Sequence, residues 1–192
     1  MSKDLGSGYK YKKIKIKYPN GDVYEGNGAA YYSGEYEPYG LGTYYHKESG
    51  VTFSADWEYR SGPDFESIKI IDKPQGRPFV IIQAYAGEIY SDLVYLGIIK
   101  AKVGEYRFKD LPSFLLEPHA WSKHMFVIKQ VNENELLFDF TGPKVDHGNF
   151  VNKAAKKGEP QELHHTVSSH IIWDHGDEYD VSQTARIKVL YF

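Results

Sequence analysis

A short pattern of glycines and aromatic residues occurs twice between residues 18 and 57. The first copy contains Gly21, Tyr24 and Gly26. Their counterparts, each 29 residues further along the chain, are Gly50, Phe53 and Ala55. Similarity at a fixed period predicts supersecondary units that stack, because one such unit cannot bury its own apolar face. Since aromatic residues favour strands and glycines favour the turns between them, the pattern predicts successive β-hairpins.

The residues of the first copy resemble the MORN repeat, a β-hairpin rich in glycine and tyrosine. The chain reads Tyr-Pro-Asn-Gly-Asp-Val-Tyr-Glu-Gly at residues 18–26 and Gly-Leu-Gly-Thr-Tyr at residues 40–44, and both segments are close to the family pattern. In the second copy Ala55 stands where the pattern has a glycine. The resemblance covers about a fifth of the chain. It implies association with other proteins and, in some members, proximity to acidic lipids.

The aromatic residues of this region are the candidate binding residues. The segment from Gly28 to Pro38 exceeds the family spacing, which predicts a long loop, and loops on a rigid scaffold often carry binding. Alternatively, the tyrosines in and after this segment extend the hairpin and cover its core. The candidates are Tyr24, Tyr31, Tyr32, Tyr36, Tyr39, Tyr44, Phe53 and Trp57. Those expected to pack within the sheet are Tyr24, Tyr44, Phe53 and Trp57.

The segment from Tyr9 to Tyr18 alternates lysines with apolar or aromatic residues. This period-two pattern predicts a strand with one exposed face and one buried face. Lysines and tyrosines together can also bind a nucleic acid, by contacts to phosphates and by stacking on bases. Acidic residues nearby oppose that interpretation, namely Asp22, Glu25, Glu35 and Glu37. Lysines on an exposed strand also prevent aggregation through the sheet edge, which requires no ligand.

Composition limits the classes of protein to which the chain can belong. The 26 acidic and 23 basic side chains nearly balance, so no overall field favours a nucleic acid or an acidic membrane. The absence of cysteine excludes disulfides and thiolate catalysis. The N-terminus lacks the apolar region of a signal peptide, and no run of eighteen apolar residues occurs. We therefore expect a soluble, cytoplasmic protein.

Proline and glycine in Asp72 to Pro78 predict a change of architecture there. We expect a disordered lead at residues 1–8, MORN-like hairpins at residues 9–77, and an antiparallel β-rich domain at residues 78–192. The predicted fold class is therefore mainly β. The second part is expected to be an antiparallel sheet or a small barrel with one short helix near residues 146–157.

Apolar segments separated by turn residues predict the strands of the second part. These strands are expected at residues 79–85, 93–99, 105–108, 124–130, 135–140, 164–173 and 179–192. The predicted helix runs from Asp146 to Lys157, where Phe150, Val151, Ala154 and Ala155 form an apolar stripe and Gly158 and Pro160 follow the last turn.

Two alternative functions concern the second part. Its order of elements is weakly similar to that of small lipocalin-like barrels, which suggests a small-molecule pocket. Residues expected to line such a pocket are Trp121, Phe126, Phe138 and Trp173. The other alternative is a metal-dependent hydrolase that uses His164, His170 and His175. On one extended strand, however, His164 and His170 would lie about 20 Å apart, too far for a shared metal.

The remaining catalytic signals are weak. The chain has no nucleophile elbow, no zinc-protease motif and no complete nucleotide-binding loop. We therefore predict no catalytic residue and no cofactor. The best-supported hypothesis from the sequence is a protein-binding or scaffolding module with an aromatic β-hairpin surface.

Overall fold

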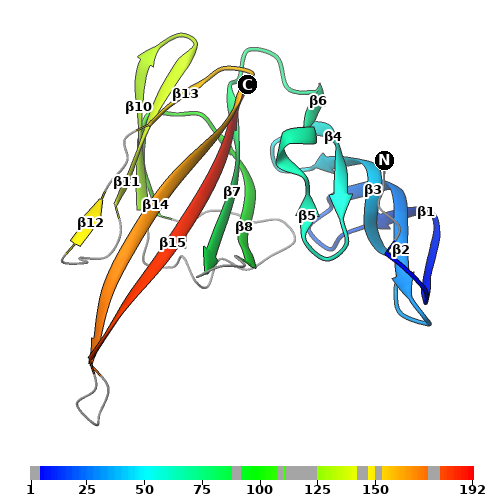
Figure 1. The fold of residues 1–192 in the computed structure, drawn as a ribbon. Helices are drawn as coiled ribbons and strands as arrows, with labels where there is room; N and C mark the ends of the chain where they lie inside the picture. Colours follow the sequence, from blue (N-terminus) through cyan, green and yellow to red (C-terminus); the bar gives the residue numbers. More distant parts are fainter. Residues whose placement is uncertain are drawn as a thin grey trace. The chain divides into compact units, whose positions relative to one another are not determined.

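Antiparallel β-strands make up most of the described chain, as the mainly β prediction requires (Figure 1). The computed structural model describes residues 5–87, 92–107, 110, 125–141, 147–149, 153–172 and 178–192. The chain forms two compact units, residues 1–77 and residues 78–192. Residues 1–4 of the expected disordered lead lie outside the described residues, whereas Leu5 and Gly8 make hydrogen bonds to Tyr11 and Tyr32.

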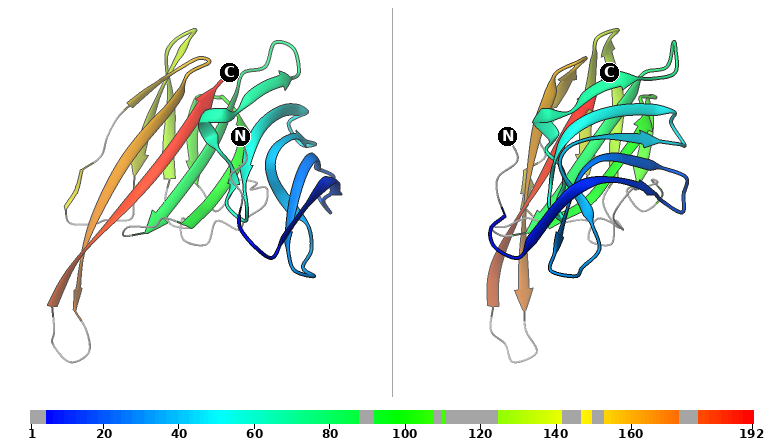
Figure 2. Two further views of the ribbon diagram at one scale, coloured as in Figure 1. Left: turned by 45° about the vertical axis from the view of Figure 1, so that its right-hand side comes forward. Right: turned by 90° about the vertical axis from the view of Figure 1, so that its right-hand side faces the viewer.

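The first unit contains one antiparallel sheet with the strand order β1-β2-β3-β4-β5, in which β6 also pairs with β4. Figure 2 shows that its strands are strongly bent. The strands are β1 (Tyr9–Lys17), β2 (Val23–Tyr31), β3 (Glu37–His46), β4 (Val51–Glu58), β5 (Gly62–Pro63) and β6 (Lys69–Asp72). A short 3-10 helix, η1 (Phe65–Ser67), lies between β5 and β6. Strand β1 covers the segment in which alternating lysines predict a strand, and its lysines are exposed.

The repeated glycines both lie in turns between neighbouring strands. Gly21 lies between β1 and β2 with φ of 90°, and Gly50 lies between β3 and β4 with φ of 71°. The amide of Gly21 donates to the carbonyl of Tyr18, and that of Gly50 donates to the carbonyl of His46, both at 2.9 Å. Glycine adopts positive φ without the steric cost that other residues meet. These two positions therefore require glycine for the same reason.

A second set of repeat positions lies side by side across three strands. Gly26 of β2 is opposite Gly42 of β3, which is opposite Ala55 of β4. A Cβ added to Gly26 would lie 2.4 Å from the Cα of Gly42, and one added to Gly42 would lie 2.3 Å from the ring of Tyr24. The two glycines therefore leave the space that the Tyr24 ring occupies.

Aromatic rings form the core of this unit. Trp57 lies at the centre, with ring centroids 5.0 Å from Tyr24, 5.7 Å from Tyr44 and 6.3 Å from Phe53. All four side chains are buried, as is Phe65 of η1. Aromatic pairs in this distance range add to the stabilisation that burial gives.

The long loop expected between Gly28 and Pro38 is mostly strand. Residues 28–31 belong to β2 and residues 37–38 to β3, so the turn comprises residues 32–36. A register shift between Gly26 and Gly28 accommodates two extra residues in β3, because the partners of these glycines are Gly42 and Pro38. The segment therefore lengthens the β2–β3 hairpin, as the alternative to a long loop predicts.

The second unit contains two antiparallel sheets, with strand orders β13-β11-β10-β9 and β12-β14-β15-β7-β8. Over the residues that the structure describes, neither sheet closes into a barrel. The strands of the first sheet are β9 (Gly104–Arg107), β10 (Met125–Asn132), β11 (Glu135–Thr141) and β13 (Lys153–Lys156). Those of the second are β7 (Phe79–Gly87), β8 (Asp92–Lys100), β12 (His147–Asn149), β14 (Pro160–Ile172) and β15 (Glu178–Tyr191). The strands predicted at residues 124–130 and 135–140 correspond to β10 and β11, which pair as a hairpin with two residues between them.

The helix predicted near residues 146–157 is wrong. Its described residues form β12 and β13 instead. In β13, Ala154 lies opposite Leu137 and Ala155 opposite Leu136 of β11, and the Ala155 side chain is buried. Pairing with β11 supplies backbone hydrogen bonds and apolar contacts, which outweigh the small helix preference of two alanines.

Candidate functional site

Four tyrosine rings contact one another in series at one end of the N-terminal sheet. The ring centroids of Tyr32 and Tyr31 are 4.5 Å apart, those of Tyr31 and Tyr9 are 5.0 Å apart, and those of Tyr9 and Tyr59 are 5.3 Å apart. Tyr32 is 63% exposed and Tyr31 is 48% exposed. We call Tyr9, Tyr31, Tyr32 and Tyr59 the tyrosine surface.

Backbone pairing places these rings. Tyr9 at the start of β1 lies opposite Tyr31 at the end of β2, and the amide of Tyr32 donates to the carbonyl of Gly8 at 2.7 Å. Tyr32 has φ of 49°, which is uncommon outside glycine. This backbone conformation turns the chain immediately after β2, so that the Tyr32 ring meets the edge of the Tyr31 ring at 76°.

Charged groups lie beside the tyrosine surface. The guanidinium carbon of Arg60 is 5.2 Å from the Tyr59 ring centroid. Its Nε donates to Glu37 at 3.1 Å, and this hydrogen bond raises the pKa of Arg60. The Nζ of Lys12 is 3.9 Å from the ring centroid of Tyr36. Cations over ring faces restrain both groups, so these contacts limit the motion of the surrounding rings.

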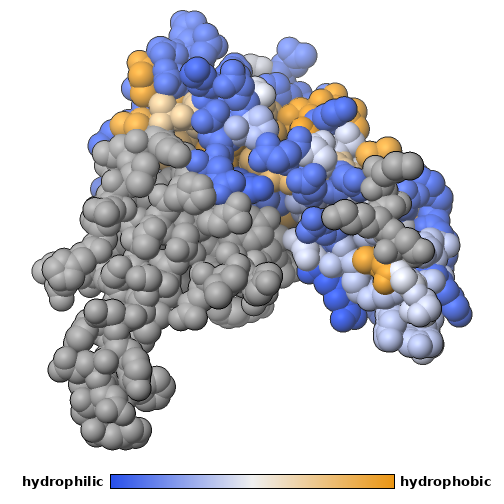
Figure 3. Space-filling view, viewed as in Figure 1, coloured by the Kyte–Doolittle hydropathy of each residue, from blue (hydrophilic) through white to orange (hydrophobic). Residues whose placement is uncertain are grey.

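The described residues of the first unit are mostly hydrophilic or intermediate in hydropathy on the face shown in Figure 3. This is the colouring that tyrosine and lysine give, rather than that of an aliphatic patch. Besides the tyrosine surface, Tyr11 is also exposed, and its ring is 5.9 Å from that of Tyr39. Aromatic residues with polar groups are typical of binding surfaces that are hydrated in the free protein and become buried when a partner binds.

The predicted binding residues divide into two groups. Tyr31 and Tyr32 are exposed and their rings contact each other, and Tyr36 is half-buried beside Lys12. Tyr39 is 7% exposed. The other candidates, which lie in the aromatic core, are Tyr24, Tyr44, Phe53 and Trp57. A partner cannot contact these core residues without opening the sheet.

The sequence reasoning missed Tyr9 and Tyr59. In the sequence, Tyr9 belongs to the segment of alternating lysines, and Tyr59 follows the end of the repeated pattern. Once the turn at Gly21 is placed, however, an antiparallel register brings residue 9 opposite residue 31. That register was the signal for Tyr9, whereas the contact of Tyr59 depends on the order of β1 to β4 in the sheet.

A buried carboxylate connects the two repeat turns at the other end of the sheet. Asp22 is 1% exposed, and its Oδ atoms accept hydrogen bonds from the Tyr44 hydroxyl at 2.7 Å, the Lys47 amide at 2.8 Å and the Asn20 side chain at 2.8 Å. Burial and Asp22 raise the pKa of Tyr44, and they raise that of Tyr18 to about 12. These hydrogen bonds join the first turn to the end of β3 and to the second turn, which indicates a structural role for Asp22.

His46 is a buried titratable group near the same turns. Its Nδ1 is 2.8 Å from the Ser49 hydroxyl, and its side chain is buried. Burial lowers the pKa of His46, because the imidazolium form loses hydration. The histidine is therefore uncharged at neutral pH and fixes the turn before β4.

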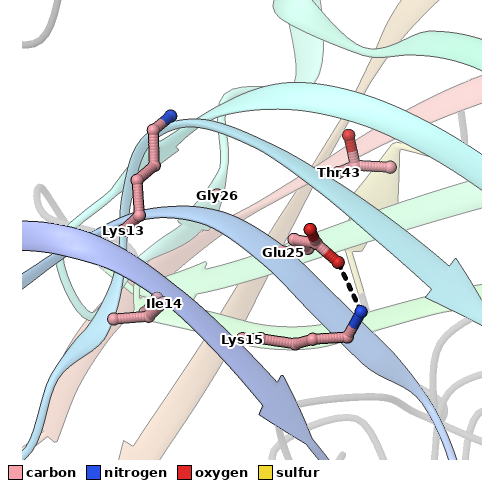
Figure 4. Close-up of a pocket in the computed structure, with 6 residues that line it drawn as sticks. All are labelled: Lys13, Ile14, Lys15, Glu25, Gly26 and Thr43. Atoms are coloured by element: carbon pink, nitrogen blue, oxygen red, sulfur yellow. Dashed lines mark hydrogen bonds and ion pairs between the residues drawn. The ribbon is translucent and has the colours of Figure 1, made fainter.

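A concave region of about 670 Å³ lies along β1, β2 and β3 (Figure 4). It is lined by Lys13, Ile14, Lys15, Glu25, Gly26 and Thr43. Lys15 donates to Glu25 at 2.6 Å, and this contact lowers the pKa of Glu25. The region combines two cationic groups with one carboxylate along β1 and β2.

The candidates of the second unit are only partly described. Trp121, Trp173 and His175 lie outside the described residues. Phe126 lies in β10 and the Phe138 side chain is buried in β11. His164 and His170 lie in β14, opposite Arg186 and Asp180 of β15. Among the residues that the structure describes, no three metal-binding side chains converge, so the pocket and metal hypotheses stay predictions.

Comparisons with protein-family models, with curated proteins and with solved structures found no match to this chain. In the described part of the chain, no helix has the length and apolarity needed to cross a membrane. The geometry of the site is therefore the basis for any function assigned to it.

Proposed function

We propose that residues 9–60 form a protein-binding module of two MORN-like hairpins, which presents the tyrosine surface to a partner protein. The observation that carries this proposal is the series of four contacting rings, two of them about half exposed or more. The positive φ of both Gly21 and Gly50, in turns between neighbouring strands, supports the MORN-like description. So does the row of Gly26, Gly42 and Ala55 across the sheet.

Tyrosine suits this task for physical reasons. A tyrosine ring covers a large area with few rotatable bonds, and its hydroxyl remains able to form hydrogen bonds. Tyrosines are accordingly enriched among the residues that contribute most to protein interfaces. Here each ring is already restrained by its neighbour, so binding loses little side-chain freedom.

The ring orientations favour a protein over a flat small molecule. Tyr9 and Tyr59 meet at 89°, and Tyr31 and Tyr32 meet at 76°. A planar ligand such as a nucleobase binds best between or upon parallel faces, and neither of these contacts provides such a slot. Rings at varied angles instead present edges, faces and hydroxyls to an irregular protein surface.

The test is affinity capture from the native host with three versions of the chain, quantified by mass spectrometry. The versions are wild type, Tyr31→Ala with Tyr32→Ala, and Tyr45→Ala. Tyr45 is a matched control because it is also exposed, at 39%, but lies in β3 near the opposite end of the sheet. We expect a partner retained by wild type and Tyr45→Ala and reduced about 30-fold or more by the double variant.

A folded double variant that retains the same proteins as wild type would contradict the proposal. Far-ultraviolet circular dichroism and urea titration establish that the variant is folded. We expect only a small change in stability, because Tyr32 is mostly exposed and Tyr31 is about half exposed.

A further inference from the structure

The outer edge of β1 is a second surface, distinct from the tyrosine surface. β1 has β2 as its only strand neighbour in the part of the chain that the structure describes. All nine residues of β1 pair with β2 in one continuous register, from Tyr9 opposite Tyr31 to Lys17 opposite Val23. The edge is therefore long and regular, and in this respect it differs from the short or bulged edges that resist pairing.

The register shows which backbone groups face outward. The amide of Tyr18 donates to the carbonyl of Asp22, and that of Tyr32 donates to the carbonyl of Gly8. Even-numbered residues of β1 therefore exchange hydrogen bonds with β2, since hydrogen-bonded pairs alternate along an antiparallel ladder. The amide and carbonyl groups of Lys13, Lys15 and Lys17 point away from β2, toward the open edge.

The side chains along this edge alternate in chemistry. Lys13, Lys15 and Lys17 are exposed on the face opposite the aromatic core, while Ile14 and Ile16 are half-buried on the core face. Lys15 pairs with Glu25, whereas Lys13 and Lys17 form no ion pair among the described residues. Figure 4 shows Lys13 and Lys15 along β1 beside the concave region, with the Lys13 side chain directed away from Glu25.

We propose that this edge binds an extended acidic segment of a partner protein, which adds to the sheet as a further antiparallel strand beside residues 13–17. Strand addition supplies main-chain hydrogen bonds for affinity and alternate side chains for specificity. A strand paired here places every second side chain next to a lysine and the others next to Ile14 and Ile16. The segment that fits has acidic residues at alternate positions and apolar residues between them.

Charge excludes the simplest competing occupant, a second copy of the same edge. Two β1 edges in contact would oppose lysines to lysines, and like charges directly opposite destabilise a strand pair. Lysines on an edge are commonly a means of preventing association. Here the lysines repel a basic strand or a second β1 edge but attract an acidic strand. The edge can therefore pair with acidic strands only.

A peptide can use features that other polyanions cannot. A nucleic acid or an acidic vesicle would interact with the lysines but not with the outward amide and carbonyl groups at their two-residue spacing. Dependence on backbone hydrogen bonds therefore distinguishes strand addition from charge attraction alone.

The test uses a fluorescein-labelled peptide containing Glu-Val-Glu-Val-Glu and the full chain, with binding followed by fluorescence anisotropy. Lys13→Pro removes one outward amide without removing a hydrogen bond to β2, as proline at an edge permits. Lys13→Ala is the matched control, because it removes the same charge and keeps the amide. We expect Lys13→Pro to weaken binding about tenfold more than Lys13→Ala, and the bound peptide to slow hydrogen exchange at the amides of Lys13, Lys15 and Lys17.

A second measurement does not depend on any protein variant. N-methylation of the peptide glutamates blocks the amides that face β1, whereas N-methylation of the valines blocks those that face away. We expect only the first to abolish binding. Equal binding by both methylated peptides, or equal effects of the two Lys13 variants, would overturn the proposal in favour of charge alone. So would a single-stranded DNA or an anionic vesicle that binds with the same pattern, or no binding of the peptide at about 1 mM.

The proposal for this edge and the proposal for the tyrosine surface can be tested separately. The Lys13 variants leave Tyr31 and Tyr32 unchanged, so a partner lost with the tyrosine variants but not with Lys13→Pro supports the proposed function alone.

Discussion

Gly42→Ala tests whether the glycines of the repeat are required by the aromatic core. A Cβ at this position would lie 2.3 Å from both the Cε2 and the hydroxyl oxygen of Tyr24. Ordinary contacts between such atoms are about 3.5 Å, so the ring must move by about 1 Å or more. Gly42 does not have a positive φ, which means that the substitution tests the space alone.

The expected loss of stability follows from what Tyr24 contacts. Its side chain is fully buried, its ring packs against Trp57, and its hydroxyl donates to the carbonyl of Asn27 at 2.6 Å. Overpacking of a core side chain costs about 1–3 kcal/mol, and loss of the hydrogen bond adds about 1 kcal/mol. We expect Gly42→Ala to lower the free energy of unfolding of the N-terminal sheet by about 2–4 kcal/mol.

Native-state hydrogen exchange at the amides of β2, β3 and β4 measures this loss, because it reports the opening free energy of this sheet separately from the second unit. Tyr24→Leu removes the ring atoms that the new methyl group would meet. In that background Gly42→Ala should cost less by about 2 kcal/mol, the coupling expected of two groups in direct contact. An equal cost in both backgrounds, or no cost in either, would refute the steric reasoning.

Three further predictions concern the same sheet. Asp22→Asn places an amide group among donors, including the Tyr44 hydroxyl, and should lower the free energy of unfolding by about 1–3 kcal/mol in urea titrations; an unchanged midpoint would contradict the structural role. Because burial lowers the pKa of His46, the unfolded state binds the proton more tightly, so stability is full above about pH 6.5 and falls as pH decreases below it. His46→Gln should remove that part of the pH dependence, and an identical pH profile would show the assignment to be wrong. The chain has no cysteine, so Lys13→Cys with Asn27→Cys, which are directly opposite, should form a disulfide on oxidation; two free thiols after oxidation would contradict this register.

The sequence was informative where one residue type is needed for a local reason. The offset between Gly21 and Gly50 marks two turns that both need positive φ, and alternating lysines in residues 13–17 mark one exposed strand face. Such signals survive in a single sequence because the requirement lies within a few residues.

The prediction of a helix near residues 146–157 was wrong because the sequence pattern behind it is not specific to helices. Two alanines followed by lysines fit a helix, but they also fit an edge strand whose alanines face Leu136 and Leu137. The partner strand is about twenty residues away in the sequence, and a local pattern carries no information about it.

The tyrosine surface was predicted in part for a similar reason. Tyr31 and Tyr32 are candidates from the sequence because they lie in the segment from Gly28 to Pro38, which exceeds the family spacing. Tyr9 joins them only through the register of β1 on β2, and Tyr59 only through the order of four strands. Residues that meet through sheet topology are found once the topology is known.

The most direct test of the central claim is photo-crosslinking in the native host, with p-benzoylphenylalanine in place of Tyr32. The same substitution at Tyr45 is the control, because both side chains are exposed but lie on different parts of the sheet. If the tyrosine surface binds a protein, irradiation should give a discrete adduct of higher mass from position 32 that is absent from position 45. The same adducts from both positions, or none from position 32, would contradict the account.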